Sequence, residues 1–261
     1  MLLVIDIGNS NLTLGVFRDA ELVAQWRLLT DRDKSAAQYD SEIRELFARD
    51  GVEVKDVQGV AIASVVPQLD HALTEIAVKE FGATPLFVDH TTNTGLKLLY
   101  DAPVELGADR IVDAAAALAK YGAPCIVVDF GTATTFNAVN AAHEYLGGVI
   151  APGVKISAEA LFSRTAKLPR VEIERPEKVI ATSTRGAMQS GLYHGYAGLV
   201  DGVLEKMIAE MGSHPRVIAT GGLAPVIASA SKFIEKIDET LTLDGLRLIH
   251  ERQSPDYTEV K

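Results

Sequence analysis

Two short sequence patterns, each present twice, constrain the fold of this chain more than any other feature. VIDIGNSN (4–11) and VVDFGTAT (127–134) both run from apolar residues through Asp, one apolar residue and Gly into small residues, most of them polar. AIASVVP (61–67) and VIATGGLAP (217–225) form a second pair, and the two pairs occur in the same order along the chain. Because strings repeated in one order indicate repeated structural units, they predict an α/β protein built from two similar halves.

Apolar periodicity predicts the strands and helices of the two halves, which we expect to be residues 1–115 and 116–261. The predicted strands cover 2–8, 12–18, 21–28, 57–67, 85–89, 125–139 (a strand, a turn and a strand), 145–154 and a segment from 216. The predicted helices cover 38–50, 68–81, 107–122 and most of 155–212, where Pro169 and Pro176 are expected to break the helical pattern. Segment 90–106 has no clear period and is predicted to be a structured loop.

Charge and cysteine content restrict the classes of function. The formal net charge is −10 and the sequence has no basic patch, so we expect no binding to the phosphate backbone of a nucleic acid. No run of ~18 apolar residues without a charge is present, which argues against a membrane span. The single cysteine, Cys125, cannot form an internal disulfide, and Met1 leads into the first strand without a basic secretory region. Both features predict a cytoplasmic protein.

The aspartates of the repeated pattern stand at the ends of apolar strands, where an unpaired carboxylate is costly. A turn of Gly and small polar residues presents backbone N–H groups in a concave arrangement that binds phosphate oxygens. Asp6 and Asp129 would then face the phosphate through a cation, which for Asp6 is a hydrated Mg²⁺. Alternatively, each Asp hydrogen-bonds its own turn as an Asx motif. Two copies in a duplicated fold favour the phosphate interpretation.

The duplicated pattern resembles the superfold shared by actin, sugar kinases and heat-shock ATPases, which is a duplicated ribonuclease H-like fold. Members of that superfold hold the phosphates of ATP with two such turns, in a nucleotide cleft between the halves. TGGLA (220–224) is similar to the element that lies near the adenosine, although an ordinary helix N-terminus is the alternative. A double glycine there allows the backbone to approach a ligand closely.

YDAPVELGADR (100–110) is more specific, because it resembles the signature of the type III pantothenate kinase family. DIGNSN (6–11), DFGTATTF (129–136) and GGVIAPG (147–153) agree with that family, and the resemblance covers about residues 1–250. It implies ATP-dependent phosphorylation of pantothenate to 4′-phosphopantothenate, the first step of coenzyme A biosynthesis.

The resemblance also implies cofactors and partners. The cofactors are ATP with Mg²⁺ and a monovalent cation, K⁺ or NH₄⁺, and the small-molecule partners are pantothenate and ATP. The family is typically homodimeric, with the substrate pocket completed near the subunit interface. We therefore expect an interface that includes the helix from 107 and the helices after 180.

Individual residues take roles from the same resemblance. Asp109 corresponds to the catalytic aspartate, which accepts the proton of the substrate's primary hydroxyl, and Asp129 corresponds to the monovalent cation site. The expected ATP contacts are Asp6, Ile7, Gly8, Asn9, Ser10, Asn11, Leu12, Thr13 and Thr132. The expected pantothenate contacts are Tyr100, Gly107, Ala108, Asp109, Arg110 and Thr184.

General chemistry supports the roles of Asp109 and Arg110. Phosphoryl transfer needs positioning, neutralisation of charge and an acceptor for the alcohol proton. At the start of a predicted helix, Asp109 is expected to be kept ionised by the positive end of the helix dipole. Arg110 can bind the pantothenate carboxylate through two hydrogen bonds. The alternatives are a helix cap for Asp109, a surface charge for Arg110 and a simple N-cap for Thr184.

The sequence departs from the family pattern at two positions. Ser10 stands where Thr is common and keeps the hydroxyl, whereas Asn137 stands where Asp is common and lacks a charge, which is expected to weaken cation binding. Two other functions stay open: a regulatory ligand-binding protein, similar to a Baf-like member of the family, and an actin-like kinase for another small alcohol. The intact aspartates of both turns, together with Asp109 and Arg110, favour catalysis over regulation.

Overall fold

In the computed structural model, which describes residues 1–254, the chain forms two compact units. Unit 1 contains residues 1–96 and 101–116 and the described residues from 242 onward, and unit 2 contains residues 97–100 and 117–241. The change of unit at 116/117 lies one residue from the expected boundary. The units differ from the expected halves because the last helix belongs to unit 1 and a short segment before Asp101 belongs to unit 2. Residues 255–261 of the expected second half lie outside the described part of the chain.

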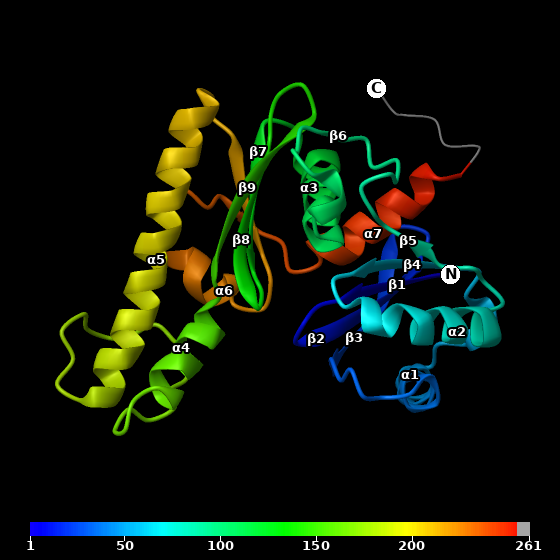
Figure 1. The fold of residues 1–261 in the computed structure, drawn as a ribbon, viewed down its shortest axis with the longest axis horizontal. Coiled ribbons are helices and arrows are strands. Elements are labelled where there is room, and N and C mark those ends of the chain that lie inside the picture. The colour runs from blue at the N-terminus through cyan, green and yellow to red at the C-terminus, as the bar shows by residue number, and fades with distance from the viewer. Residues whose placement is uncertain (255–261) are drawn as a thin grey trace. The chain divides into compact units, whose positions relative to one another are not determined.

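Unit 1 is built on a five-stranded sheet with the strand order β3-β2-β1-β4-β5 (Figure 1). Its strands are β1 (Leu2–Ile7), β2 (Asn11–Arg18), β3 (Glu21–Leu29), β4 (Gly59–Ser64) and β5 (Leu86–Phe87). β1 pairs with β2 in antiparallel and with β4 in parallel orientation, so that Asp6 lies opposite both Thr13 and Ala63. The carboxyl ends of β1 and β4 therefore meet at one edge of the sheet.

Helices cover this sheet and complete the core of unit 1. They are α1 (Ala36–Arg49), α2 (Asp70–Phe81), the first part of α3 (Ala108–Tyr121) and nearly all of α7 (Leu241–Arg252). α1 and α2 lie next to each other beside the sheet, and α1 buries Tyr39, Ile43 and Phe47 at helical spacing (Figure 1). α7 packs on β2 and β4, where the glycines 15 and 59 leave room for its side chains.

Unit 2 repeats this topology in a six-stranded sheet with the order β11-β10-β7-β8-β9-β6. Its strands are β6 (Lys97–Leu98), β7 (Cys125–Phe130), β8 (Ala133–Val139), β9 (Glu144–Pro152), β10 (Arg216–Thr220) and β11 (Lys236–Ile237). β7 is antiparallel to β8 and parallel to β10, as β1 is to β2 and β4. The two repeated sequence pairs thus occupy equivalent strands, which confirms the predicted duplicated α/β fold.

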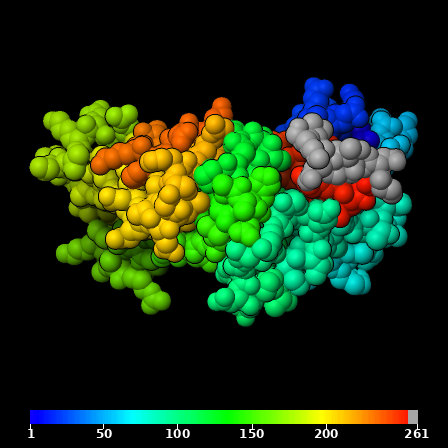
Figure 2. Space-filling model, turned by 90° about the horizontal axis from the view of Figure 1, so that it is seen from above, coloured from blue at the N-terminus to red at the C-terminus, as the bar shows by residue number. Residues whose placement is uncertain are grey.

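The helices of unit 2 are α4 (Val154–Ser163), α5 (Thr184–Met211) and the short α6 (Ala224–Ile227). α5 buries Leu192, Tyr196 and Val200 in a core shared with β7, β8 and β10. Figure 2 shows α5, in yellow, side by side with the orange segment that runs from α6 to β11. None of the helices among residues 1–254 is both long enough and apolar enough to span a membrane.

The structure differs from the expected elements in one segment and confirms the expected break in another. The expected loop 90–106 contains the two-residue strand β6, which pairs in parallel with β9. The expected helical region 155–212 contains two helices separated by residues 164–183, which form no regular element. Pro169 and Pro176, where the break was expected, both lie in this segment. Proline disfavours a continuous helix because it lacks the N–H donor and clashes with the preceding turn.

Candidate active site

The first phosphate turn, residues 8–11 of unit 1, joins β1 to β2. Gly8 N–H donates a hydrogen bond to the carbonyl oxygen of Asn11 at 2.9 Å. Thr30, directly after β3, donates twice: its N–H to the Ser10 carbonyl at 3.1 Å and its Oγ1 to the Gly8 carbonyl at 2.6 Å. Three carbonyls of the turn are thereby bound within the chain, so the shape of the turn is fixed without a ligand.

The expected ATP contacts differ in what they can offer to a ligand. The side chains of Ile7 and Leu12 are fully buried in the core of unit 1, so these two residues can meet a nucleotide only through their backbone. Asn9 and Ser10, at the tip of the turn, are exposed. The difference follows from position, because Ile7 and Leu12 pair with each other at the ends of β1 and β2, whereas Asn9 and Ser10 lie in the turn between these strands.

The Asp109 segment lies at the same end of the sheet in unit 1. Asp109 stands in the first turn of α3, and its Oδ1 accepts a hydrogen bond from Arg110 N–H at 2.8 Å. A Cβ on Gly107 would lie 2.5 Å from that Oδ1 and 3.6 Å from Val65 Cγ1, so glycine is needed there. Val65 directly follows β4, and its N–H donates to the Ile7 carbonyl at 3.0 Å. The start of α3 therefore contacts the strand ends from which the first phosphate turn begins.

The pKa of Asp109 results from opposing effects. Burial raises the pKa of this carboxyl above its usual range, and the hydrogen bond and the charge of Arg110 oppose the shift without cancelling it. Desolvation is the largest of these effects, and the expectation that the helix dipole keeps Asp109 ionised stays a prediction. A carboxylate with a raised pKa is the stronger base, which suits an acceptor of an alcohol proton. Arg110 is only 6% exposed, which excludes the alternative of a surface charge.

The second phosphate turn, Gly131 and Thr132 of unit 2, joins β7 to β8. Asp129 lies opposite Thr220 in the parallel pair of β7 and β10. A Cβ on Gly221, whose φ is +89°, would overlap Asp129 Oδ1, and a Cβ on Gly131 would lie 2.9 Å from Oδ2. The TGGLA segment therefore lies directly beside the carboxylate of Asp129. One carboxylate oxygen lies close to Gly221 and the other close to Gly131.

Tyr100 lies beside Tyr145, a buried residue of unit 2 that forms a hydrogen bond with Asn137. Its ring centroid is 6.2 Å from that of Tyr145, and a Cβ on Gly147 would lie 3.9 Å from its Cε2. Tyr145 is fully buried, and its hydroxyl donates to Asn137 Oδ1 at 2.9 Å. Asn137 therefore helps to position Tyr145, whose ring lies beside that of Tyr100. Its expected effect on cation binding stays a prediction.

Thr184 is the first residue of α5 and lies at a pocket of unit 2. The N-cap is Ser183, whose side chain accepts from Gly186 N–H at 3.2 Å, so the N-cap alternative for Thr184 is wrong. The pocket has a volume of about 480 Å³ and is lined mainly by apolar residues of α4, α5 and the segment between them. Besides Thr184 its lining includes Leu161, Leu168, Met188, Gly191 and Gly195.

The described residues provide few possible ligands for a metal ion, which suits a metal that is bound mostly by substrate and water. Within residues 1–254 there is no group of three or more His, Cys, Asp or Glu side chains that could hold a metal ion. Mg²⁺ in phosphate-transfer sites is commonly bound by one or two carboxylates together with the phosphates and water. Asp6, which directly precedes the first phosphate turn of unit 1, matches that need, and Asp129 stays the predicted residue for the monovalent cation.

Two residues that contact the first phosphate turn were not predicted from the sequence. These are Thr30, described above, and Arg32, whose Nη2 donates to Asn9 Oδ1 at 2.9 Å. Both lie in the polar run TDRDKS (30–35), which directly follows β3. The available signal was a polar run at the end of β3, because the neighbouring antiparallel strand β2 begins at the phosphate turn.

Known proteins are similar to this chain in sequence and in fold. A sequence model of the type III pantothenate kinase family matches residues 2–206. A type III pantothenate kinase from Koribacter versatilis (strain Ellin345) is 53% identical over 262 residues, which cover 97% of this chain and 96% of that protein. A Campylobacter jejuni protein assigned to the Baf family of transcriptional activators has a TM-score of 0.60 at 19% identity, covering 96% of this chain and 98% of its own.

A further solved structure extends the likeness to sugar kinases. A Sinorhizobium meliloti protein assigned as a 2-dehydro-3-deoxygalactonokinase has a TM-score of 0.58 at 14% identity, covering 100% of this chain and 99% of its own. The structural likenesses show the duplicated actin-like fold, and the sequence matches show the family. This chain belongs to the type III pantothenate kinase family.

Proposed function

We propose that this chain transfers the γ-phosphoryl group of ATP to pantothenate and forms 4′-phosphopantothenate, the first step of coenzyme A biosynthesis. The observation that carries the proposal is the Asp109–Arg110 pair at the start of α3. The pair combines a carboxyl whose pKa burial raises with a buried guanidinium, beside the strand ends that carry the first phosphate turn. Membership of the family supplies the identity of the substrate.

The reaction needs one proton transfer and one phosphoryl transfer. Asp109 accepts the proton of the primary hydroxyl while the hydroxyl oxygen bonds to the γ-phosphorus and the bond from that phosphorus to ADP breaks. Arg110 binds the pantothenate carboxylate, and Tyr100, Gly107, Ala108 and Thr184 are further substrate contacts. A raised pKa makes the Asp109 carboxylate a stronger base for this proton.

The two phosphate turns bind the nucleotide. Asp6 and the N–H groups of the first turn take Mg²⁺-bound phosphate, and Thr132 is a contact from the second turn. Mg²⁺ neutralises charge on the phosphate oxygens when it is bound. Asp129 holds the monovalent cation, K⁺ or NH₄⁺, which offsets the repulsion between ATP and a chain of net charge −10.

An ADP-release assay with and without pantothenate and potassium tests this function. We expect ADP release that depends on pantothenate and increases with K⁺. Asp129→Asn should abolish the K⁺ effect and raise the KM for ATP by on the order of tenfold, the factor that corresponds to ~1.4 kcal/mol of lost binding. Glu235→Gln, which removes an exposed carboxylate of unit 2, is the matched control and should keep the K⁺ effect.

The same assay separates the other two functions. ADP release with a different small alcohol but not with pantothenate would show a kinase of other specificity. Nucleotide binding without any turnover would show a regulatory protein. Either result would overturn the proposed function.

We also propose a homodimer that forms through α5. Gly191, Gly195, Gly198 and Gly202 follow one another at intervals of four, three and four residues, so they share one face of the helix. A Cβ on any of them would meet nothing within 4 Å, and small residues allow two helices to approach closely. Because Gly191 and Gly195 also line the pocket at Thr184, a second copy on this face would complete that pocket.

Light scattering during gel filtration tests the dimer. Gly198→Leu places a bulky side chain on the glycine face and is expected to shift the protein from dimer to monomer, with a higher KM for pantothenate. Glu210→Leu, an exposed position near the end of α5, controls for added apolar bulk. A monomeric unchanged protein, or a dimer that Gly198→Leu leaves intact, would contradict this interface.

We place the enzyme in the cytoplasm, without a nucleic-acid or membrane partner, on the charge and cysteine arguments. The structure adds that Cys125 is buried at the start of β7 and that burial raises the pKa of its thiol to about 12. Such a thiol stays protonated and unreactive at neutral pH.

A further inference from the structure

The loop between β3 and α1 carries a positive charge to the first phosphate turn. Arg32 is exposed, and its guanidinium contacts the turn through the hydrogen bond from Nη2 to Asn9 Oδ1. Aspartates flank it on both sides in the sequence, at 31 and 33. Nevertheless, among residues 1–254 Arg32 forms no ion pair with a carboxylate.

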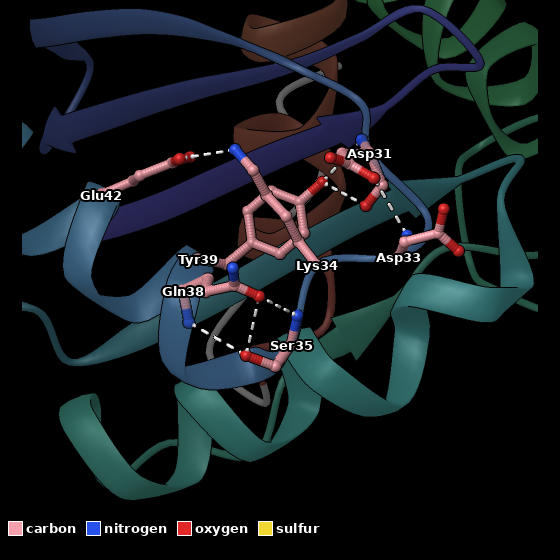
Figure 3. A network of polar contacts seen from close by, with 7 residues as sticks. All are labelled: Asp31, Asp33, Lys34, Ser35, Gln38, Tyr39 and Glu42. Atoms are coloured by element: carbon pink, nitrogen blue, oxygen red, sulfur yellow. Dashed lines mark hydrogen bonds and ion pairs between the residues drawn. The ribbon is translucent and has the colours of Figure 1, made fainter.

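The side chain of Asp31 is directed into the loop itself, whereas the carboxylate of Asp33 points away from it (Figure 3). Asp31 Oδ1 accepts a hydrogen bond from Asp33 N–H at 3.0 Å and so closes an Asx turn around Arg32. The backbone of Asp31 is held by the hydroxyl of Tyr39, which accepts from its N–H and donates to its carbonyl, both at 2.9 Å. Because Tyr39 is fully buried, this contact ties the base of the loop to the core of unit 1.

The other side of the loop is anchored as well. Ser35 and Gln38 form a capping box that starts α1, and Lys34 pairs with Glu42 at 2.5 Å (Figure 3). The charge of Lys34 is therefore matched by a carboxylate, whereas that of Arg32 is not. Together the anchors fix Arg32 at the apex of a preorganised turn, which reduces the entropy lost when it binds a ligand.

The surroundings of Arg32 indicate an anion as its ligand. A guanidinium has five N–H donors, and the bond to Asn9 uses one of them. The remaining donors lie beside a turn whose carbonyls at Gly8, Ser10 and Asn11 are already bound within the chain. A planar fork of donors matches the geometry of phosphate oxygens.

We propose that Arg32 binds the polyphosphate of the nucleotide and that Asn9 holds its guanidinium in position. This inference rests on the proposed function, because it takes the first turn as the phosphate site. It adds a charged contact from the loop after β3, which no motif of the sequence pointed to. Arg32 then supplies part of the positive charge that an acidic chain needs at this site.

Calorimetric titration with ADP and with adenosine, both without pantothenate, tests Arg32. Arg32→Ala is expected to weaken ADP binding by ~10-fold or more, as for loss of a charge-assisted phosphate contact, and to leave adenosine binding unchanged. Arg32→Lys keeps the charge but loses the fork, so its loss should be smaller. Arg18→Ala is the matched control: the same charge is removed at the exposed far end of β2, and ADP affinity should not change.

A second substitution separates phosphate binding from mere support of the turn. If Arg32 acted only by holding Asn9, Arg32→Ala would have no effect in an Asn9→Ala background. We expect a loss of ADP affinity in that background too. An unchanged ADP affinity in Arg32→Ala, or equal losses for ADP and adenosine, would overturn the inference.

The outcomes also distinguish this inference from the proposed function. An Arg32 effect on ADP binding in a protein that does not phosphorylate pantothenate would refute the function and keep the phosphate contact. Normal pantothenate turnover with unchanged ADP affinity in Arg32→Ala would refute the contact and keep the function. Failure of the unchanged protein to bind ADP would refute both.

Discussion

Asp109→Asn is expected to lower kcat for pantothenate phosphorylation by roughly 10² or more, the scale of a lost general base. Asparagine keeps the size of the side chain but cannot accept the hydroxyl proton. Because Asp109 acts on the alcohol, the affinity for ATP should remain nearly unchanged. Steady-state ADP release and calorimetric titration with ATP measure the two effects separately.

The same substitution is expected to stabilise the folded protein at neutral pH. Burial raises the pKa of Asp109 above its ordinary value of 3.8, so the folded state binds this proton more tightly than the unfolded chain does. The stabilising contribution is therefore full below pH 3.8 and is lost as the pH rises through the raised pKa. Above that pH the folded protein carries the cost of a buried carboxylate, which asparagine removes. The melting temperature of Asp109→Asn should exceed that of the unchanged protein at pH 7.5, and the difference should shrink toward pH 4.

Glu75→Gln is the matched control for Asp109→Asn, because it removes an exposed carboxylate from α2 in the same unit. It should change neither kcat nor the melting temperature. Equal turnover in Asp109→Asn and the unchanged protein would remove Asp109 from the mechanism. A lower melting temperature for Asp109→Asn at pH 7.5 would contradict the account of its burial.

Gly221→Ala is expected to destabilise unit 2 by about 3 kcal/mol and to raise the KM for ATP by tenfold or more. The backbone φ of +89° disfavours any residue with a side chain. The new Cβ would also overlap Asp129 Oδ1 and lie 2.7 Å from the backbone N and C of Phe130. The carboxylate proposed to hold the cation must then move. Urea denaturation and ATP-dependent kinetics measure the two losses.

Gly212→Ala separates the backbone effect from the overlap. Gly212 ends α5 with a φ of +59°, and a Cβ there would meet nothing within 4 Å. We expect its substitution to cost about 1 kcal/mol, from backbone strain alone, and to leave the KM for ATP unchanged. If both variants lost the same stability and the same ATP affinity, close packing of TGGLA against Asp129 would not matter for the site.

The core of the fold could be predicted because its signals are local and occur twice. β1 and β7 carry the same run of apolar residues followed by Asp and Gly, and β4 and β10 repeat the second pattern. α1 was predictable from apolar residues at helical spacing, of which Ile43 and Phe47 are buried. Periodicity and turn residues are sufficient for elements of this kind.

The remaining parts depend on contacts between distant segments. β6 has two residues and exists because it pairs with β9, so no periodicity within 90–106 could indicate it. α7 follows the second repeat in sequence but packs in unit 1, where Gly245 fits against Val112 and Thr242 Oγ1 donates to Asp113 at 2.7 Å. Such packing is decided by tertiary contacts that a single sequence does not show.

The residues of the candidate site also fall into two groups: those that a local motif predicts and those that depend on contacts between distant segments. Asp109 and Arg110 stood out because their flanking residues form a specific motif, and the structure withdraws both from solvent. The direction of the Asp109 pKa shift could not be predicted, because it depends on how deeply the fold buries the carboxyl relative to its hydrogen bonds and the charge of Arg110. Thr30 and Arg32 were missed because they reach the first turn from the segment after β3, which is distant in sequence from the turn itself.

A crystal structure with pantothenate and a non-hydrolysable ATP analogue tests the central claim most directly. The quantity to measure is the distance from the Asp109 carboxylate oxygens to the primary hydroxyl of pantothenate. We predict a hydrogen bond of about 2.6–3.2 Å, with that hydroxyl facing the γ-phosphorus. A pantothenate hydroxyl bound away from Asp109, with the carboxylate turned toward solvent, would contradict the account.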